Sequence, residues 1–400
     1  MLGDISFANY EKADDIHGTV LYPAVMIAPV QKKLIQEIMS ADKIGSVFDP
    51  FYGSGTSLYE AFKLDNNLKL IGCDINPLAY LITSTKLNGV SRYIKHSIKQ
   101  LEYNLTIKPT NTIKFYNIDK WFRKDIQVSL MQVREAIIKT RIKKDRMFFW
   151  CMFCDTIRKY SNTRSSTYKL HIKTDDSIQR INNNVISDFK QSVNNSYSMY
   201  TNCAKNIELY KTDTMKLLDK FEANSIDMII TSPPYGDNAT TVTYGQYSSI
   251  ILKWIDEKDL RLEGWELTNY SVIDSNSLGG TKKHSNISSE YMILIKPYID
   301  NISSSKKKKV INFFSDYFYI LERLCKITKK YIVFTVGNRT VDGVEINLNR
   351  ITQNFFELCN FKKEICAERN IIRKRTPKHL IANGRKISSM NKEYVIVYSK

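Results

Sequence analysis

The sequence predicts an α/β protein in which a mainly parallel sheet carries helices on both faces. Short apolar runs alternate with amphipathic stretches along most of the 400 residues, and this pattern is typical of strands joined by helices. The chain has 15 glycines and 9 prolines, too few for a collagen-like or low-complexity protein. Its length fits one large domain with insertions, or two domains.

The expected elements repeat a strand–turn–helix order. In sequence they are an extended stretch and helix at 17–39, strand–turn–helix units at 45–64, 68–87 and 206–218, a strand with a proline-containing loop at 225–238, a helix and strand at 316–338, a helix at 351–361 and a strand at 393–400. Residues 275–286 and 303–310 are expected to be loops. Because the carboxyl ends of parallel strands meet at one edge, the loops that follow them should gather in one crevice.

Basic residues are concentrated in two segments. The chain carries 59 Lys and Arg against 41 Asp and Glu, a net charge of +18. Residues 91–200 hold 21 basic and 9 acidic side chains, and residues 361–400 hold 11 and 3. This surplus predicts a polyanionic partner, and its confinement to two segments favours nucleic acid.

The composition also divides the chain. Segments 1–94, 204–238 and 316–400 carry the predicted sheet and are expected to form one catalytic domain in three parts. A basic, helical insertion at 95–203 and a smaller insertion at 239–315 separate them. Either insertion could read the nucleic acid.

The seven cysteines lack the spacing of a disulfide framework, which predicts a reducing, cytoplasmic environment. Cys151 and Cys154 form a C-x-x-C inside an apolar helical pattern, so we expect core packing and no metal site. The chain has no apolar run of about 18 residues and no signal-like start, so neither a membrane span nor a secretory signal is expected.

Residues 49–56, Asp-Pro-Phe-Tyr-Gly-Ser-Gly-Thr, follow the first predicted strand. Gly53 and Gly55 allow a sharp turn and a close approach of the backbone to a ligand. The acid at Asp49 would repel a phosphate but attract an ammonium group, and the Gly-x-x-x-x-Gly-Lys pattern of phosphate-binding loops is absent.

Two further acids follow strands. Asp74 is placed to accept hydrogen bonds from the two hydroxyls of a ribose. Asp213 could accept from an adenine amino group, or could simply cap the helix that follows it.

Residues 231–235, Thr-Ser-Pro-Pro-Tyr, form the most specific motif. Consecutive prolines fix the backbone and remove two N–H donors, so carbonyl oxygens remain as acceptors. The Ser232 hydroxyl and the Pro233 carbonyl could accept the two hydrogens of an exocyclic amine, while Tyr235 stacks on the ring that carries it.

The two motifs together resemble the S-adenosyl-L-methionine-dependent amino-methyltransferases of DNA, which act on cytosine N4 or adenine N6. The resemblance covers about 1–90, 204–240 and 316–400 and implies a Rossmann-like fold of the class I methyltransferase type. Residues Tyr22, Pro23 and Ala24 resemble the family's amino-terminal segment that closes over the methionine end of the cofactor.

The resemblance implies a role for each motif residue. The cofactor-binding residues would be Tyr22, Pro23, Asp49, Pro50, Phe51, Gly53, Gly55, Thr56, Asp74, Ile75, Asp213 and Thr231. The catalytic residues would be Ser232, Pro233, Pro234 and Tyr235. The target amine is inaccessible in a duplex, so the base would be flipped out.

Duplex DNA is the implied partner, and a cognate restriction endonuclease is compatible with the family. Cations mixed with hydroxyls and aromatics are typical of phosphate contacts. The expected nucleic-acid-binding residues are Arg158, Lys159, Asn162, Arg164 and Lys169, with a second cluster at Arg373, Lys374 and Arg375.

Within the family, a serine before Pro-Pro-Tyr is more usual in cytosine-N4 enzymes and an aspartate in adenine-N6 enzymes. Ser232 therefore favours cytosine N4, with adenine N6 as the alternative. No Pro-Cys dipeptide supplies the thiolate that carbon methylation needs.

Two other functions are weighed against these. A tRNA guanine-N2 methyltransferase uses such a loop but usually carries an amino-terminal RNA-binding domain, for which 1–44 is too short. A non-catalytic nucleic-acid-binding protein on a decayed fold conflicts with the intact set of Asp49, Asp74 and Ser232.

Overall fold

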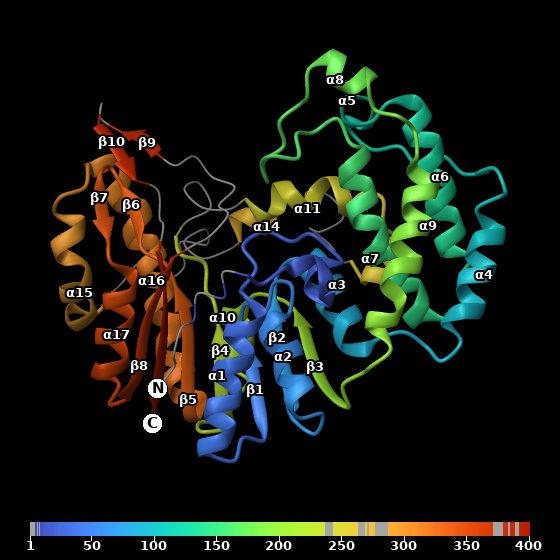
Figure 1. The fold of residues 1–400 in the computed structure, drawn as a ribbon. Helices are drawn as coiled ribbons and strands as arrows, with labels where there is room; N and C mark the ends of the chain where they lie inside the picture. Colours follow the sequence, from blue (N-terminus) through green and yellow to red (C-terminus); the bar gives the residue numbers. More distant parts are fainter. Residues whose placement is uncertain are drawn as a thin grey trace.

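A seven-stranded sheet forms the centre of the computed structural model, in the order β3-β2-β1-β4-β5-β11-β8 (Figure 1). The structure describes residues 5, 7, 9–236, 243–262, 269, 272–276, 287–370, 379–382, 385–388 and 392–400. The parallel strands are β1 (Ser46–Asp49), β2 (Lys69–Asp74), β3 (Asn206–Lys211), β4 (Ile226–Thr231) and β5 (Thr328–Val336). Strand β11 (Lys392–Ser399), beside β5, runs antiparallel to these five strands. Strand β8 (Lys362–Asn370) pairs antiparallel with β11 and therefore runs in the same direction as β5. The predicted α/β class with a mainly parallel, Rossmann-like sheet is confirmed.

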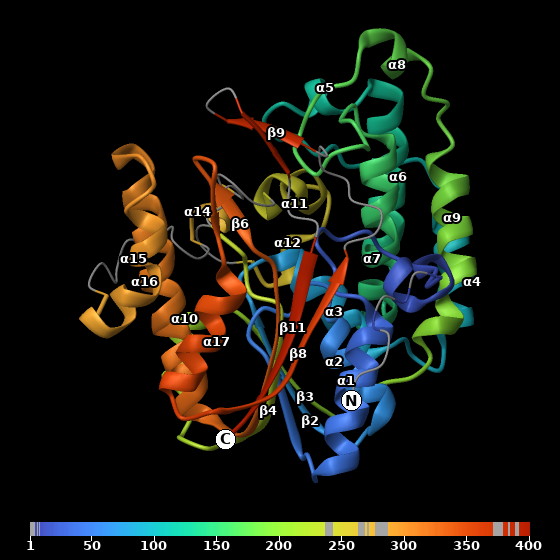
Figure 2. The same cartoon turned by 60° about the vertical axis from the view of Figure 1, so that its left-hand side comes forward.

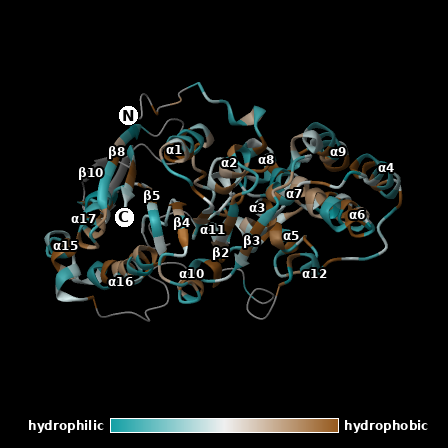
Figure 3. Cartoon of the chain, turned by 90° about the horizontal axis from the view of Figure 1, so that it is seen from below, coloured by the Kyte–Doolittle hydropathy of each residue, from teal (hydrophilic) through white to brown (hydrophobic). Residues whose placement is uncertain are grey.

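Both faces of this sheet are apolar. Successive residues of each strand point to opposite sides, so a continuous apolar strand supplies both faces. Val47 and Leu70 belong to one core cluster, whereas their neighbours Phe48 and Ile71 belong to the other. The first cluster is covered by α1 (Ala28–Ala41), α2 (Thr56–Leu64) and α3 (Pro77–Asn88), and the second by α10 (Thr214–Leu218), α16 (Ser304–Ile327) and α17 (Leu348–Leu358). Figures 2 and 3 show the sheet between these two helical layers.

The first insertion is helical, as predicted. It comprises α4 (Ile94–Asn104), α5 (Ile118–Trp121), α6 (Lys124–Ile138), α7 (Lys143–Tyr160), α8 (Asp175–Gln179) and α9 (Val185–Ser196). Helix α7 packs against α3, and the Cys151 thiol lies 3.6 Å from the Leu81 carbonyl oxygen of that helix. Cys151 and Cys154 are fully buried, so the predicted core packing is confirmed, and burial raises the pKa of the Cys151 thiol to about 12.

The second insertion contains α11 (Tyr244–Leu252), α12 (Glu257–Leu260), α14 (Val272–Ser275) and α15 (Ser289–Ile299). The prediction of a loop at 303–310 is wrong, because the four lysines 306–309 lie in the first turns of α16. Lysine is a good helix former, and the apolar period of α16 starts at Val310, directly after them. The segment boundary expected at 315 therefore falls inside a helix. Most of the other expected loop, residues 277–286, lies outside the described residues.

Several short strands were not predicted. They form two hairpins, β6 (Arg339–Val341) with β7 (Val344–Ile346) and β9 (His379–Ala382) with β10 (Arg385–Ser388). The edge strand β8 was missed too, because most of its side chains are charged or polar, as is usual at a sheet edge. Within the described residues, the helices are all too short or too polar to cross a membrane.

The two insertions are tied to each other by a nearly buried ion pair. Arg146 of α7 donates from Nε and Nη2 to the Asp259 carboxylate of α12, at 2.7 and 2.6 Å. The Trp150 indole donates to the same carboxylate at 2.8 Å. Asp259 is 7% exposed, so three donors offset the cost of burying its charge.

We expect Asp259→Ala to lower the free energy of unfolding by about 3–5 kcal/mol, because Arg146 and Trp150 would lose their acceptor while remaining largely buried. Urea denaturation followed by circular dichroism measures this. The matched control is Asp300→Ala, which removes a solvent-exposed pair with Lys296 and should change the free energy of unfolding far less. Equal costs for the two variants would contradict the structural role of Asp259.

Candidate active site

A pocket lies at the carboxyl ends of the parallel strands, at the edge that the sequence predicts. It is lined by Tyr22, Pro23, Ala24, Val25, Met26, Phe51, Tyr52, Gly53, Ser54, Thr56, Asp74, Ile75, Asn76, Asp213, Thr214, Met215, Ser232, Pro234, Tyr244, Ile273, Asp274, Asn276, Asp316 and Ile320. Ten of these belong to the residue set expected from the motifs. Among the described residues, Asp49, Pro50, Gly55, Thr231, Pro233 and Tyr235 lie outside this lining.

The glycine-containing loop is shaped by two left-handed residues. Gly53 and Gly55 have φ angles of 49° and 73°, and Gly55 caps the start of α2. A Cβ on Gly55 would lie 2.6 Å from the Thr83 side chain, whose hydroxyl donates to the Gly53 carbonyl at 2.9 Å. Only glycine therefore fits at position 55 without displacing α3.

Asp49 is completely buried beneath the loop. Its carboxylate accepts from the Phe51 N–H at 3.1 Å, the Ser57 hydroxyl at 2.8 Å and the Thr231 hydroxyl at 2.7 Å. Burial raises the pKa of Asp49 to about 6, against the opposing effect of these three donors. The carboxylate thus joins the ends of β1 and β4 to the first turn of α2.

Asp74, at the end of β2, forms part of the pocket wall. Its two carboxylate oxygens accept from the Gly53 and Asn76 backbone N–H groups at 2.9 and 2.8 Å. Burial raises its pKa to about 6, and the same N–H bonds work against that rise. A carboxylate has about four acceptor sites, so Asp74 keeps capacity for hydroxyl donors in the pocket.

Asp213 takes one of the two roles weighed for it in the sequence, and its position in the pocket is compatible with the other. Its side chain caps α10 by accepting from the Met215 N–H at 3.0 Å, which confirms the capping role. It also lines the pocket beside Met215. Its contact with an adenine amino group stays a prediction.

The amino-terminal wall is held by side chains from distant segments. The Tyr22 hydroxyl accepts from the Asn76 amide at 3.1 Å, and its ring stacks on Tyr244 with centroids 5.8 Å apart. The Leu21 N–H donates to Asp155 of α7 at 3.0 Å, and the Leu21 carbonyl accepts from Tyr247 of α11 at 2.7 Å. Both insertions therefore position this wall.

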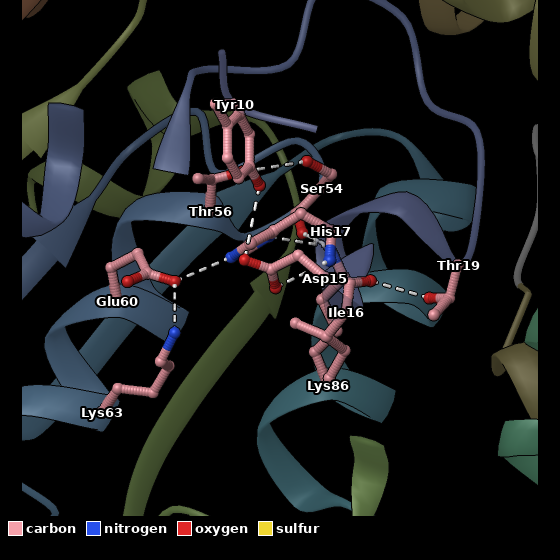
Figure 4. A network of polar contacts seen from close by, with 10 residues as sticks. All are labelled: Tyr10, Asp15, Ile16, His17, Thr19, Ser54, Thr56, Glu60, Lys63 and Lys86. Atoms are coloured by element: carbon pink, nitrogen blue, oxygen red, sulfur yellow. Dashed lines mark hydrogen bonds and ion pairs between the residues drawn. The ribbon is translucent and has the colours of Figure 1, made fainter. Parts of the chain in front are cut away.

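A buried polar network anchors the chain just before that wall (Figure 4). His17, in the short 3-10 helix η2 (Ile16–Gly18), bonds through Nε2 to Glu60 of α2 at 2.9 Å. Its Nδ1 lies 3.4 Å from the Lys86 ammonium, which also donates to the Ser54 carbonyl at 2.9 Å. Burial lowers the pKa of Lys86 to about 7. The network fixes the amino-terminal segment to the glycine loop.

Three ligand-type groups come together in this network. Asp15, His17 and Glu60 each offer an atom within 4.8 Å of the others. His17 and Glu60 bond directly, however, and Glu60 also pairs with Lys63 at 3.2 Å. No sequence motif marks this group, because Glu60 is 43 residues from His17.

The loop of residues 232–235, which the sequence predicts to be catalytic, follows β4. The hydroxyls of Ser232 and Tyr235 lie 2.9 Å apart, and Tyr235 also donates to Glu393 of β11 at 3.5 Å. Burial raises the pKa of Tyr235 well above its usual value, with a further contribution from the Glu393 charge. Ser232 and Pro234 face the pocket, whereas Pro233 is buried.

Residues of the second insertion complete the pocket and carried no sequence signal. Tyr244 and Asp274 line it from α11 and α14. Asp274 caps α11 by accepting from the Gly245 and Gln246 N–H groups at 2.8 and 3.2 Å. A tyrosine and an aspartate without a motif around them cannot be distinguished from surface residues in a sequence.

The expected nucleic-acid-binding residues differ in exposure. Arg158 is 8% exposed, donates to the Thr167 carbonyl at 2.8 Å and lies 5.1 Å from the Tyr247 ring centre. Asn162 is 5% exposed and donates to the Lys120 carbonyl at 3.0 Å. These two side chains shape the loop, so their predicted DNA contacts would require a rearrangement.

The other expected residues are on the surface or outside the described part. Arg164 and Lys169 are exposed, and Lys159 is exposed but paired with Asp188. Their loop is anchored next to the pocket, because Tyr168 packs against Tyr247 with ring centroids 5.8 Å apart. The predicted contacts of Arg373, Lys374 and Arg375 fall outside the described residues.

Comparisons with known proteins find similarity to DNA methyltransferases. Residues 32–215 match the family described as D12 class N6 adenine-specific DNA methyltransferase. The chain is also 29% identical over 411 residues to the Type II methyltransferase M.MvaI of Kocuria varians, covering 93% of this chain and 88% of the relative. Together these matches support a DNA methyltransferase. The methyl donor that this class of enzyme implies is S-adenosylmethionine.

The pocket described above fits such a donor. Phe51, Ile75 and Met215 supply apolar walls for a flat base, and the acids Asp74 and Asp213 supply acceptors. A Cβ on Gly53 would lie 3.3 Å from the Tyr22 ring, so the loop and the amino-terminal wall meet closely. Asp74 would hold the ribose hydroxyls and Tyr22 would cover the methionine end.

We expect Asp74→Ala to weaken S-adenosylmethionine binding by about 1.5–3 kcal/mol, the scale of hydrogen bonds to a charged acceptor. Isothermal titration calorimetry measures this. In the parent protein, affinity should fall as the pH drops below about 6, because the protonated carboxyl loses acceptor capacity.

The matched control is Asp65→Ala, in the turn at the opposite end of β2. It should bind like the parent. Unchanged affinity in a folded Asp74→Ala protein would remove Asp74 from the site.

Proposed function

We propose that this protein transfers a methyl group from S-adenosylmethionine to an exocyclic amine of a base in duplex DNA. The proposal rests on one observation: Ser232 and Pro234 of the catalytic loop line the same pocket as Gly53 and Asp74, the residues expected to hold the cofactor. Cofactor and target base could therefore meet in one cavity, as direct transfer requires.

The catalytic loop would activate the amine by orienting it. The lone pair of an exocyclic amine is delocalised into the ring, so the nitrogen is a weak nucleophile. The Ser232 hydroxyl and the Pro233 carbonyl would accept its two hydrogens and favour a pyramidal nitrogen. Bound S-adenosylmethionine would supply the methyl group as a sulfonium substituent. Positioning would then provide most of the acceleration, because no covalent intermediate with the protein is needed.

Adenine N6 has the better support as the target, ahead of the cytosine N4 that the sequence first favours. The description of the matching family names adenine N6. Cytosine N4 is the second candidate, because the matched range ends at residue 215, before Ser232. Either base presents an amine that the same two acceptors could hold.

We also propose a cognate type II restriction endonuclease as a partner in the cell. The support is the name of the relative, a Type II methyltransferase, together with the extent of the match along both chains. Methylation would then protect the host's own sites from that nuclease.

DNA isolated from cells that express the protein should contain N6-methyladenine, or N4-methylcytosine if the second candidate holds. Ser232→Ala should lower the methylation rate by ~10²–10³, by analogy with the loss of one oriented catalytic hydrogen bond. Mass spectrometry of digested nucleosides identifies the base, and single-turnover assays with purified protein give the rate.

The matched control is Ser225→Ala, an exposed serine just before the same strand, which should methylate normally. The absence of both methylated bases with the parent protein would contradict the proposed function. Full activity in Ser232→Ala would show that the amine is oriented by other groups.

DNA affinity should fall steeply as the salt concentration rises, because basic side chains that bind phosphates release the counterions condensed on DNA. Replacing the exposed Arg164 and Lys169 by alanine should reduce the slope of log affinity against log salt by ~0.9 for each phosphate that the variant no longer neutralises. The matched control is Lys329→Ala, which removes an exposed cation near the start of β5, at the opposite end of the strand from the pocket. Equal slopes of log affinity against log salt for the parent and the double variant would exclude the loop from the DNA interface.

A further inference from the structure

A partly buried carboxylate lies behind the loop of residues 232–235. Glu393 on β11 lies opposite Arg369 on β8 in the register of the two antiparallel strands. Arg369 donates to Glu393 Oε2 from Nε at 3.0 Å, and its Nη2 forms an ion pair with the same oxygen at 2.9 Å. The Glu393 side chain is 19% exposed and the Arg369 side chain 6%, so water competes little for this pair. Within the described residues, Arg369 contacts Oε2, whereas Oε1 faces Tyr235.

That second oxygen faces the Tyr235 hydroxyl at 3.5 Å. The distance is long for an O–H···O bond, as catalytic hydrogen bonds often are before the substrate arrives. Across the part of the chain that the structure describes, the partners of the Tyr235 hydroxyl are Glu393 and Ser232. The three side chains therefore form a line from β11 to the pocket.

Each hydroxyl in this line has one proton to donate, whereas an ionised carboxylate can only accept. The Tyr235 proton must therefore point to Glu393. The Tyr235 oxygen is then free to accept the proton of Ser232, 2.9 Å away. Ser232 is left with lone pairs and no proton on its pocket side.

We propose that Glu393, held by Arg369, fixes the direction of the hydrogen bonds from Ser232 through Tyr235, so that Ser232 presents only an acceptor to the target amine. This inference rests on the proposed function. Glu393 and Arg369 are positioning residues, because neither lines the pocket. The opposite direction would point the Ser232 proton at an N–H of the base, and two donors would face each other.

Glu393→Gln tests this with a side chain of nearly the same shape. The two donors of Arg369 would select the amide oxygen, which turns the amide NH₂ toward Tyr235. Tyr235 would then accept from Gln and donate to Ser232, and the direction of the line would reverse. We expect the single-turnover methylation rate to fall at least about tenfold, while the affinities for S-adenosylmethionine and DNA stay within about threefold of the parent.

The decisive readout is a double-mutant cycle with Tyr235→Phe. Without the tyrosine hydroxyl, Ser232 can no longer sense the group at position 393. Glu393→Gln should therefore cause little further loss in the Tyr235→Phe background. A purely structural role of Glu393 would lower the rate equally in both backgrounds. Glu368→Gln, which alters an exposed pair with Lys392 on the same two strands, is the matched control and should behave like the parent.

The outcomes separate the inference from the proposed function. A parent protein that methylates neither adenine nor cytosine would refute the function itself. A parent that methylates, with Glu393→Gln equally fast or equally impaired in both backgrounds, would overturn the inference alone. Should Glu393→Gln fail to fold, Tyr235→Phe by itself must slow methylation in a folded protein that binds cofactor normally, and an unchanged rate would overturn the inference.

Discussion

The active site depends on the hydrogen bonds of one buried carboxylate. Asp49 ends β1, and its two oxygens are shared among the Phe51 N–H, the Ser57 hydroxyl and the Thr231 hydroxyl. The glycine-containing loop that lines the pocket and the strand that leads to residues 232–235 are therefore held at one point. Removing a single donor there would leave buried polar groups unpaired, at a cost of about 1–3 kcal/mol each.

The pocket walls are assembled from segments far apart in sequence. Asp155 of α7 and Tyr247 of α11 hold the Leu21 backbone from both sides, and Tyr244 stacks on Tyr22. The ion pair of Arg146 and Asp259 joins the same two insertions. The insertions thus support the wall of the pocket, whatever their contact with DNA.

Local sequence motifs made part of the pocket lining predictable. The glycine loop, Asp74, Asp213 and the Ser232 loop could be placed from the sequence because each follows a strand, and the topology of a parallel sheet brings strand ends together. Tyr244, Asp155 and Glu393 could not be placed, because tertiary packing alone brings them to the site. Composition likewise identified a basic loop but not its exposed side chains, so Arg158 and Asn162 proved to be internal.

The central claim is that the bond from Thr231 to Asp49 sets the geometry of the catalytic loop. Its most direct test is the single-turnover methylation rate of Thr231→Val, which keeps the shape of the side chain and removes the hydroxyl. We predict a loss of at least about tenfold, equivalent to ~1.4 kcal/mol, with cofactor affinity nearly unchanged and with activity retained in Thr231→Ser. A folded Thr231→Val protein that methylates at the parent rate would contradict the claim.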